Sequence, residues 1–212
     1  MLKKIYNKVT HEWDTSVEEA LKSFIRLPAL SPDFDKKWEE NGVLLKALED
    51  AQAWAEKQGI KGLRCEIIKD DGFTPCLFVE VDATSDKKFE RSVFFYGHLD
   101  KQPPNEGWDP DKSAWEPVIQ NGRLYGRGAV DDGYAFYTSL AAVKALQTLG
   151  IPHPRCVGLF ERVSLPPLRI VFKGSRTEAR RYRTGDRFGQ LLRRLRQTLG
   201  DFLAQRHARG HD

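Results

Sequence analysis

The stretch "FFYGHLDKQPP" (residues 94–104) decides how this sequence is interpreted. An apolar, strand-like run ends at Gly97, and His98 and Asp100 follow with one residue between them. Alternate residues of an extended segment point to the same side, so this imidazole and carboxylate can face one point beyond the end of a strand. Ligand sites of open α/β sheets lie at that edge, and both groups can bind zinc. A surface histidine beside an aspartate is the simpler alternative, which this pair alone leaves open.

A second stretch, "NGRLYGRGAVDDG" (residues 121–133), brings two further carboxylates into the argument. Its glycines allow the backbone to approach a bound group closely, and a helical pattern follows at once. Asp132 is best interpreted as the N-cap of that helix. Asp131 is either a second capping residue or a carboxylate shared by two metal ions, which need a common anionic ligand to offset their repulsion.

The patterns around these two stretches predict an α/β domain built on a mixed sheet. Helices are expected over residues 16–26, where Ser16 and Glu19 form a capping box, over 35–58 with Gly59 as the terminating residue, and over 132–149. Strand patterns cover "LRCEIIKD", "PCLFVEVD", "RSVFFYGH" and "PRCVGLFE", the first two as a hairpin and the third as an internal strand. A small hairpin is expected around "QNGR".

Composition narrows the class of protein further. The chain has 212 residues, of which 30 % are charged and 40 % hydrophobic, as in a globular protein. No apolar run reaches the length that spans a bilayer, and the N-terminus lacks a signal-peptide pattern, so a cytoplasmic protein without membrane contacts is expected. Three widely spaced cysteines, Cys65, Cys76 and Cys156, argue against a disulfide framework or a cysteine zinc site.

Charge divides the chain near residue 161. Residues 1–161 hold 21 Lys and Arg against 26 Asp and Glu, a net charge of −5, whereas residues 162–212 hold 13 against 4, a net charge of +9. The cation also changes, from 15 Lys and 6 Arg in the first part to 1 Lys and 12 Arg in the second. We therefore expect two parts: a globular part over 1–161 and an Arg-rich tail over 162–212 of uncertain structure.

The two quoted stretches, with "WEP" between them, resemble the N-terminal part of the M20 family of zinc metallopeptidases. That family includes carnosinase-like dipeptidases, glutamate carboxypeptidases and succinyl-diaminopimelate desuccinylase, and the resemblance covers roughly residues 16–161. It implies a three-layer, mixed-sheet catalytic domain of the metallopeptidase type, which is incomplete in this chain. The glycine at position 133 departs from the family pattern, in which lysine is usual there.

The resemblance also implies roles for individual residues. His98 matches the first zinc ligand, and Asp100 matches the acidic residue that orients it and is counted as catalytic. Asp131 matches the carboxylate that bridges the two zinc ions, for which cobalt or manganese can substitute.

The family pattern stops where the charge changes. Relatives follow the last strand with a Glu-Glu pair, typically in "EESGS", whose first Glu is the general base and whose second is a zinc ligand. Here Glu161 is followed by "RVSLPPLR", and Glu161 itself matches a position upstream of that pair. We therefore expect residues 162–212 to be foreign to the family, as a shifted reading frame would make them, and the chain to be truncated and inactive.

By resemblance, then, the expected function is dinuclear zinc-dependent hydrolysis of dipeptides or related amides, by a metallopeptidase of the dipeptidase or carboxypeptidase type. Its partner would be a small peptide with a free carboxylate, and the intact relatives form homodimers. Two alternatives stay open. The basic tail could bind nucleic acid or an anionic surface, although neither partner is expected, or the chain could regulate an intact relative.

Overall fold

The computed structural model describes residues 1–69, 73–84 and 92–161. The expectations for the Arg-rich tail and for a boundary near residue 161 lie outside these residues. The helices are α1 (Leu2–Glu12), α2 (Glu18–Arg26), α3 (Trp38–Asn41), α4 (Val43–Glu56) and α5 (Tyr134–Thr148). The strands are β1 (Leu63–Ile68), β2 (Cys76–Val81), β3 (Val93–His98), β4 (Val118–Gln120), β5 (Arg123–Tyr125) and β6 (Cys156–Glu161).

Four strands form one mixed sheet in the order β1-β2-β6-β3. β2 pairs antiparallel with both β1 and β6, whereas β3 and β6 run parallel with His98 opposite Glu161. The mixed sheet and its helices confirm the predicted α/β class. The prediction that β3 is internal is wrong for the part of the chain that the structure describes, because there β3 stands at the edge of the sheet beside β6.

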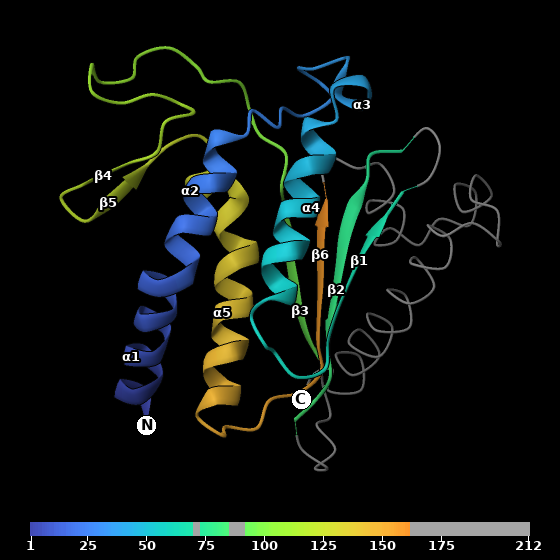
Figure 1. The fold of residues 1–212 in the computed structure, drawn as a ribbon, viewed down its shortest axis with the longest axis vertical. Coiled ribbons are helices and arrows are strands. Elements are labelled where there is room, and N and C mark those ends of the chain that lie inside the picture. The colour runs from blue at the N-terminus through green and yellow to red at the C-terminus, as the bar shows by residue number, and fades with distance from the viewer. Residues whose placement is uncertain (70–72, 85–91, 162–212) are drawn as a thin grey trace, which may run out of the picture.

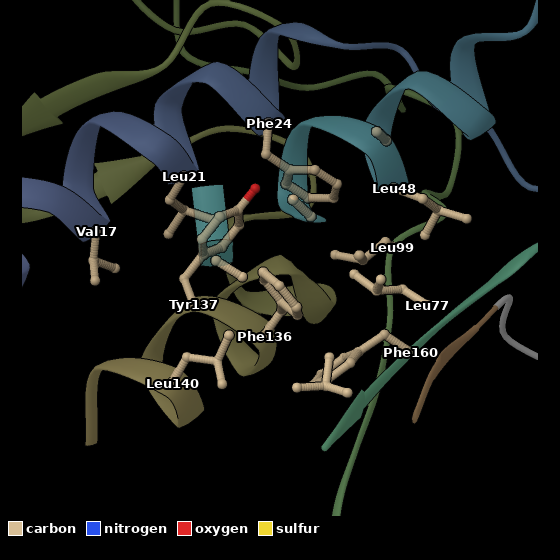
Figure 2. Packing of buried hydrophobic residues seen from close by; sticks show 14 of the residues in the cluster. Val17, Leu21, Phe24, Leu48, Leu77, Leu99, Phe136, Tyr137, Leu140 and Phe160 are labelled. Carbon is tan, nitrogen blue, oxygen red and sulfur yellow. The ribbon is translucent and has the colours of Figure 1, made fainter. Parts of the chain in front are cut away.

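The labelled helices lie together on one side of the sheet (Figure 1). α4 and α5 pack against the strands, and α1 and α2 pack on these two helices. Figure 2 shows the apolar core between them, where the ring of Phe136 makes edge contacts with Tyr137 and Phe160. The Phe136 ring also makes an edge contact with Trp54. Leu99, the residue between the two site candidates His98 and Asp100, is wholly buried in this core. The core therefore fixes the backbone of the candidate site directly.

The N-terminal helix begins earlier than its sequence pattern predicts. α1 continues through a π-helical turn, Trp13–Val17, into α2, so Ser16 lies inside a helical segment and forms no capping box. Its hydroxyl instead donates to Gln58 Oε1 (3.2 Å) and accepts the indole N–H of Trp54 (3.0 Å). The local pattern is wrong here because partners distant in sequence use the hydroxyl.

The other boundaries follow from glycines at positive φ. Gly42 (φ 67°) separates α3 from α4, which divides the single helix predicted over residues 35–58. Gly59 (φ 66°) follows α4, as predicted. Asn121 and Gly122 have φ values of 53° and 73° and join β4 to β5, as expected for a tight hairpin.

Two negative expectations can be compared with the described residues. All three cysteines are free thiols, two of them buried. None of the helices described here combines the length and apolarity needed to cross a bilayer.

Candidate metal centre

The candidate site lies where β3 and β6 end. The two strands run parallel, so their carboxyl ends meet at one edge of the sheet, and Leu99 N–H extends the pairing to the carbonyl of Glu161 (3.2 Å). α5 begins at this edge too, packed against β3 and preceded by the Ala129–Gly133 segment. Chain segments more than 30 residues apart in sequence are thereby brought together.

His98, Asp100 and Asp131 come together as the sequence predicts, with the imidazole in the middle. His98 Nδ1 lies 3.0 Å from the main-chain oxygen of Asp100 and 3.2 Å from its carboxylate. His98 Nε2 lies 3.1 Å from Asp131 Oδ1. The Asp100 side chain is buried, whereas that of Asp131 is 59 % exposed, so the ring links an inner carboxylate to an outer one.

Because the two ring nitrogens point in opposite directions, Asp100 and Asp131 cannot share one ion with His98. Consistent with this, no three His, Cys, Asp or Glu side chains among the described residues converge as one metal-binding group. His98 Nε2 and Asp131 therefore face a common point, whereas Asp100 lies on the other side of the ring.

The charges around the ring raise the pKa of His98. Burial works against this, but the hydrogen bond and charge of Asp100, together with the charge of Asp131, outweigh it. The surroundings thus favour a positive charge near the imidazole, whether it is a proton or a cation.

Asp132 has a different role from the one predicted. No side chain caps the start of α5; instead, Asp132 Oδ2 accepts the main-chain N–H of His98 (3.3 Å). The contact depends on Gly97, because a Cβ there would lie 2.7 Å from this oxygen. Burial raises the pKa of Asp132. The capping prediction is therefore wrong: the carboxylate joins the Asp131 loop to the end of β3, and the peptide bond between Asp131 and Asp132 is cis.

The unusual glycine at position 133 has a structural reason. A Cβ at Gly133 would lie 2.3 Å from the ring of Phe24, a buried residue of α2, and 2.8 Å from the main-chain oxygen of Gly128. The Phe24 ring thus fills the space into which a side chain at position 133 would project. The Ala129–Gly133 segment, which carries Asp131, therefore packs against α2.

Two further polar residues at this edge are buried, although the sequence analysis assigned Glu161 no role in the site and did not single out Lys101. Glu161 is buried and accepts the hydroxyl of Tyr96 (2.9 Å), and burial, only partly offset by that hydrogen bond, raises the pKa of its carboxyl group to about 7. Lys101 is 1 % exposed, directly after Asp100. A lysine in an otherwise polar loop gives no sequence signal of burial.

Comparison with known proteins gives the class of protein that this segment resembles. Residues 94–160, which contain His98, Asp100 and Asp131, match the model of peptidase family M20/M25/M40. This match confirms the resemblance predicted from the sequence for these residues.

Individual relatives agree with this class. The chain is 49 % identical over 51 residues to succinyl-diaminopimelate desuccinylase of Acidiphilium cryptum and 37 % identical over 78 residues to Beta-Ala-His dipeptidase of Mus musculus. These alignments cover 24 % and 34 % of this chain, but only 13 % and 15 % of the relatives. The chain thus matches a small part of each relative's length.

Solved structures share the fold. Human carnosine dipeptidase 1 superposes with a TM-score of 0.61 at 22 % sequence identity, covering 82 % of this chain and 38 % of that one. Dug1p, a dipeptidase of Saccharomyces cerevisiae, gives 0.57 at 20 % identity, with 85 % and 37 % covered. At these identities the likeness establishes the α/β fold of the region that carries the candidate site.

Proposed function

We propose that this chain carries part of the divalent-metal centre of an amide hydrolase that acts on dipeptides or related amides. In this proposal His98, through Nε2, and Asp131 are metal ligands, and Asp100 fixes the His98 ring. The match of residues 94–160 to an M20-type model supports the class of reaction. The names of the relatives, dipeptidases and desuccinylases, support the class of substrate.

One observation carries the proposal: the protonation pattern that the His98 contacts require. The two Asp100 oxygens near Nδ1 are acceptors, so Nδ1 must carry a proton and donate it. In the neutral ring, Nε2 then presents a lone pair to the Asp131 carboxylate, 3.1 Å away. Two acceptors at this distance repel each other unless a proton or a cation lies between them.

A metal ion can take the place of the proton between this pair of groups. Imidazole nitrogen and carboxylate oxygen are ordinary zinc donors, and two donors of one tetrahedral zinc ion lie about 3.3 Å apart. Asp100 supplies the second contact that zinc-bound histidines usually make through their other nitrogen, which fixes the ring and its tautomer. These observations concern the donors of this chain and support zinc, with cobalt or manganese as substitutes.

Each of these residues has its own role in the proposed metal site. A bound zinc ion supplies Lewis acidity toward a substrate carbonyl. His98 and Asp131 hold the ion, Asp100 holds the proton on Nδ1, and Asp132 keeps the loop of Asp131 against β3. Two described donors do not complete a tetrahedral site, so further ligands have to come from water or from groups outside the described residues. The second zinc ion implied by the family belongs to the same proposal.

Zinc titration of the full chain tests the metal site. Isothermal titration calorimetry at neutral pH should show binding that is lost in His98→Ala, because the substitution removes the proposed nitrogen ligand. His11→Ala, which removes an exposed histidine on α1, is the matched control and should bind as the parent chain does. Equal zinc binding by the parent chain and His98→Ala would refute the proposal.

Hydrolysis is a separate measurement. We expect zinc binding without turnover of a dipeptide panel in the presence of zinc, cobalt or manganese, because no Glu-Glu pair follows Glu161 in this sequence. Turnover that disappears in His98→Ala would support the metal site but would mean that another group of the chain supplies the base.

A further inference from the structure

Lys101 follows Asp100 directly and is buried, although lysine is seldom fully buried without partners. Its ammonium group donates to three main-chain oxygens at the end of α2: those of Phe24, Ile25 (3.3 Å) and Leu27 (2.5 Å). The carbonyls at the end of a helix lack intrahelical partners and carry the negative end of the helix dipole. Lys101 therefore caps α2 from a loop that lies more than 70 residues further along the chain.

Aromatic rings complete the surroundings of this ammonium group. Its nitrogen lies 3.9 Å from the ring centroid of Phe24 and 5.5 Å from that of Trp115. Both distances allow cation–π attraction. Burial lowers the pKa of Lys101, whereas the carbonyl oxygens and the ring faces favour the ammonium form. The site is thus built to hold a cationic side chain in one position.

The main chain of Lys101 is held as well. Its N–H donates to the carbonyl of Ala29 (2.8 Å), and its carbonyl accepts the N–H of Ser31 (2.9 Å). The segment that carries Asp100 is therefore attached to the residues just after α2 by backbone and side chain together.

The aliphatic part of Lys101 reaches the second loop of the site. A Cβ at Gly128 would lie 2.8 Å from Lys101 Cε, and the Gly128 carbonyl accepts the N–H of Gly133 (2.9 Å). Gly128 and Gly133 thus lie before and after Asp131 in the loop. Gly128 packs against Lys101, and Gly133 packs against Phe24. The Lys101 side chain therefore contacts both α2 and the loop that leads to Asp131. The backbone of Lys101 belongs to the segment that carries Asp100.

We propose that Lys101 is a positioning residue that sets the separation of His98 Nε2 and Asp131 by fixing both loops to the C-terminal end of α2. The role of that separation in metal binding rests on the function proposed above. Lys101 touches neither metal nor substrate in this account. It acts through Asp100, which orients the His98 ring, and through Gly128, which supports the loop of Asp131.

The main test replaces Lys101 by methionine, which keeps an unbranched chain of similar length but has no charge and no donor. Zinc titration of the full chain should show about 10- to 100-fold weaker binding in Lys101→Met, the usual effect of losing a residue that supports a metal ligand. Lys101→Gln, which retains a shorter amide donor, should give an intermediate affinity. Unchanged affinity in Lys101→Met would overturn the proposal.

Two controls separate positioning from stability and from the proposed metal site. Glu12→Gln loosens a buried contact between α1 and α5 and should leave zinc affinity unchanged although it lowers stability. In metal-free protein at a pH above the raised pKa of His98, where the ring is neutral, ¹⁵N NMR should show one Nδ1–H tautomer in the parent chain and a tautomer mixture in Lys101→Met. If the parent chain binds no zinc, the proposed function fails, but this NMR comparison still decides the role of Lys101.

Hydrogen exchange in the parent chain covers the case in which neither variant folds. Zinc should slow exchange of the Lys101 and Ser31 amides as well as those of His98 and Leu99, because both loops are fixed to the same helix end. Protection confined to His98 and the Asp131 loop would show that Lys101 only caps α2. In the absence of zinc binding, rapid exchange at Lys101 and Ser31 would contradict the fixed attachment itself.

Discussion

Two clusters of charged side chains in this molecule are balanced in opposite ways. Between α1 and α5, the buried carboxylate of Glu12 bonds to both Lys8 and Lys144, each at 2.7 Å. At the end of β3, the carboxylates of Asp100 and Asp131 bond to the two nitrogens of one imidazole. The first cluster has an excess of cationic groups and the second an excess of anionic ones. The difference fits a stabilising role for the first cluster and the metal site proposed above for the second.

The largest expected effect comes from weakening the first cluster. Glu12→Gln leaves two lysines facing a neutral amide, which should lower the free energy of unfolding by about 3 kcal/mol, the lower end of the range for a broken buried ion pair. The lower end applies because the lysine side chains are 23 % and 26 % exposed and recover hydration. Urea denaturation measures the change. Asp50→Asn, which removes the surface pair with Lys46, is the control and should change stability by less than about 1 kcal/mol.

Zinc should stabilise the second cluster and leave the first untouched. At a free zinc concentration 100 times the dissociation constant, the free energy of unfolding should rise by about 2.7 kcal/mol, provided that the unfolded chain does not bind zinc. Thermal denaturation with zinc and with a chelator gives the difference. The same shift in Glu12→Gln and no shift in His98→Ala would confirm the contrast, whereas a shift in His98→Ala would place the zinc elsewhere.

Acid should act on the first cluster through Glu12. Burial raises the pKa of Glu12, but the hydrogen bonds and charges of Lys144 and Lys8 outweigh burial and hold it below its usual 4.5. The stability from these contacts is therefore present above pH 4.5 and is lost as the pH falls through the lower folded-state value. The slope from this group cannot exceed about 1.4 kcal/mol per pH unit. Denaturation curves below pH 4.5 should fall less steeply for Glu12→Gln; parallel curves would rule out this assignment.

The smallest effect is expected at the site itself. In metal-free protein Asp131→Asn removes one anionic group from an acid-rich cluster, so stability should stay within about 0.5 kcal/mol of the parent chain, because exposed charges contribute little. The Asp131 side chain is 59 % exposed, which fits this small value. Urea denaturation with a chelator measures it, and zinc titration of the same variant should show weakened binding. A loss of stability as large as that of Glu12→Gln would mean that Asp131 is structural.

Much of the site could be predicted because its residues lie in two short stretches with recognisable patterns. The alternation in "GHLD" and the loop before α5, taken together with the family resemblance, indicated that His98, Asp100 and Asp131 belong to one site. Asp132 and Ser16 could not be placed in this way. Each has a side chain that fits a helix cap locally but is used by a distant group, the His98 N–H in one case and α4 in the other.

The burial of Lys101 was hidden for a related reason. Its partners are main-chain oxygens at the end of α2, and main-chain groups leave no trace in the residue pattern. Within the described residues β3 lies at the edge of the sheet and not inside it as predicted, since an apolar strand can owe its burial on one face to helices. Sequence patterns locate chemical groups well, but they do not report which backbone group each side chain meets.

Positions 24 and 133 are far apart in the sequence, but side chains at these two positions compete for the same space. One of them can hold a bulky group only while the other holds almost none. Chains of this type with lysine after the aspartate pair should therefore carry a small residue where Phe24 stands, so that the two positions vary as a matched pair.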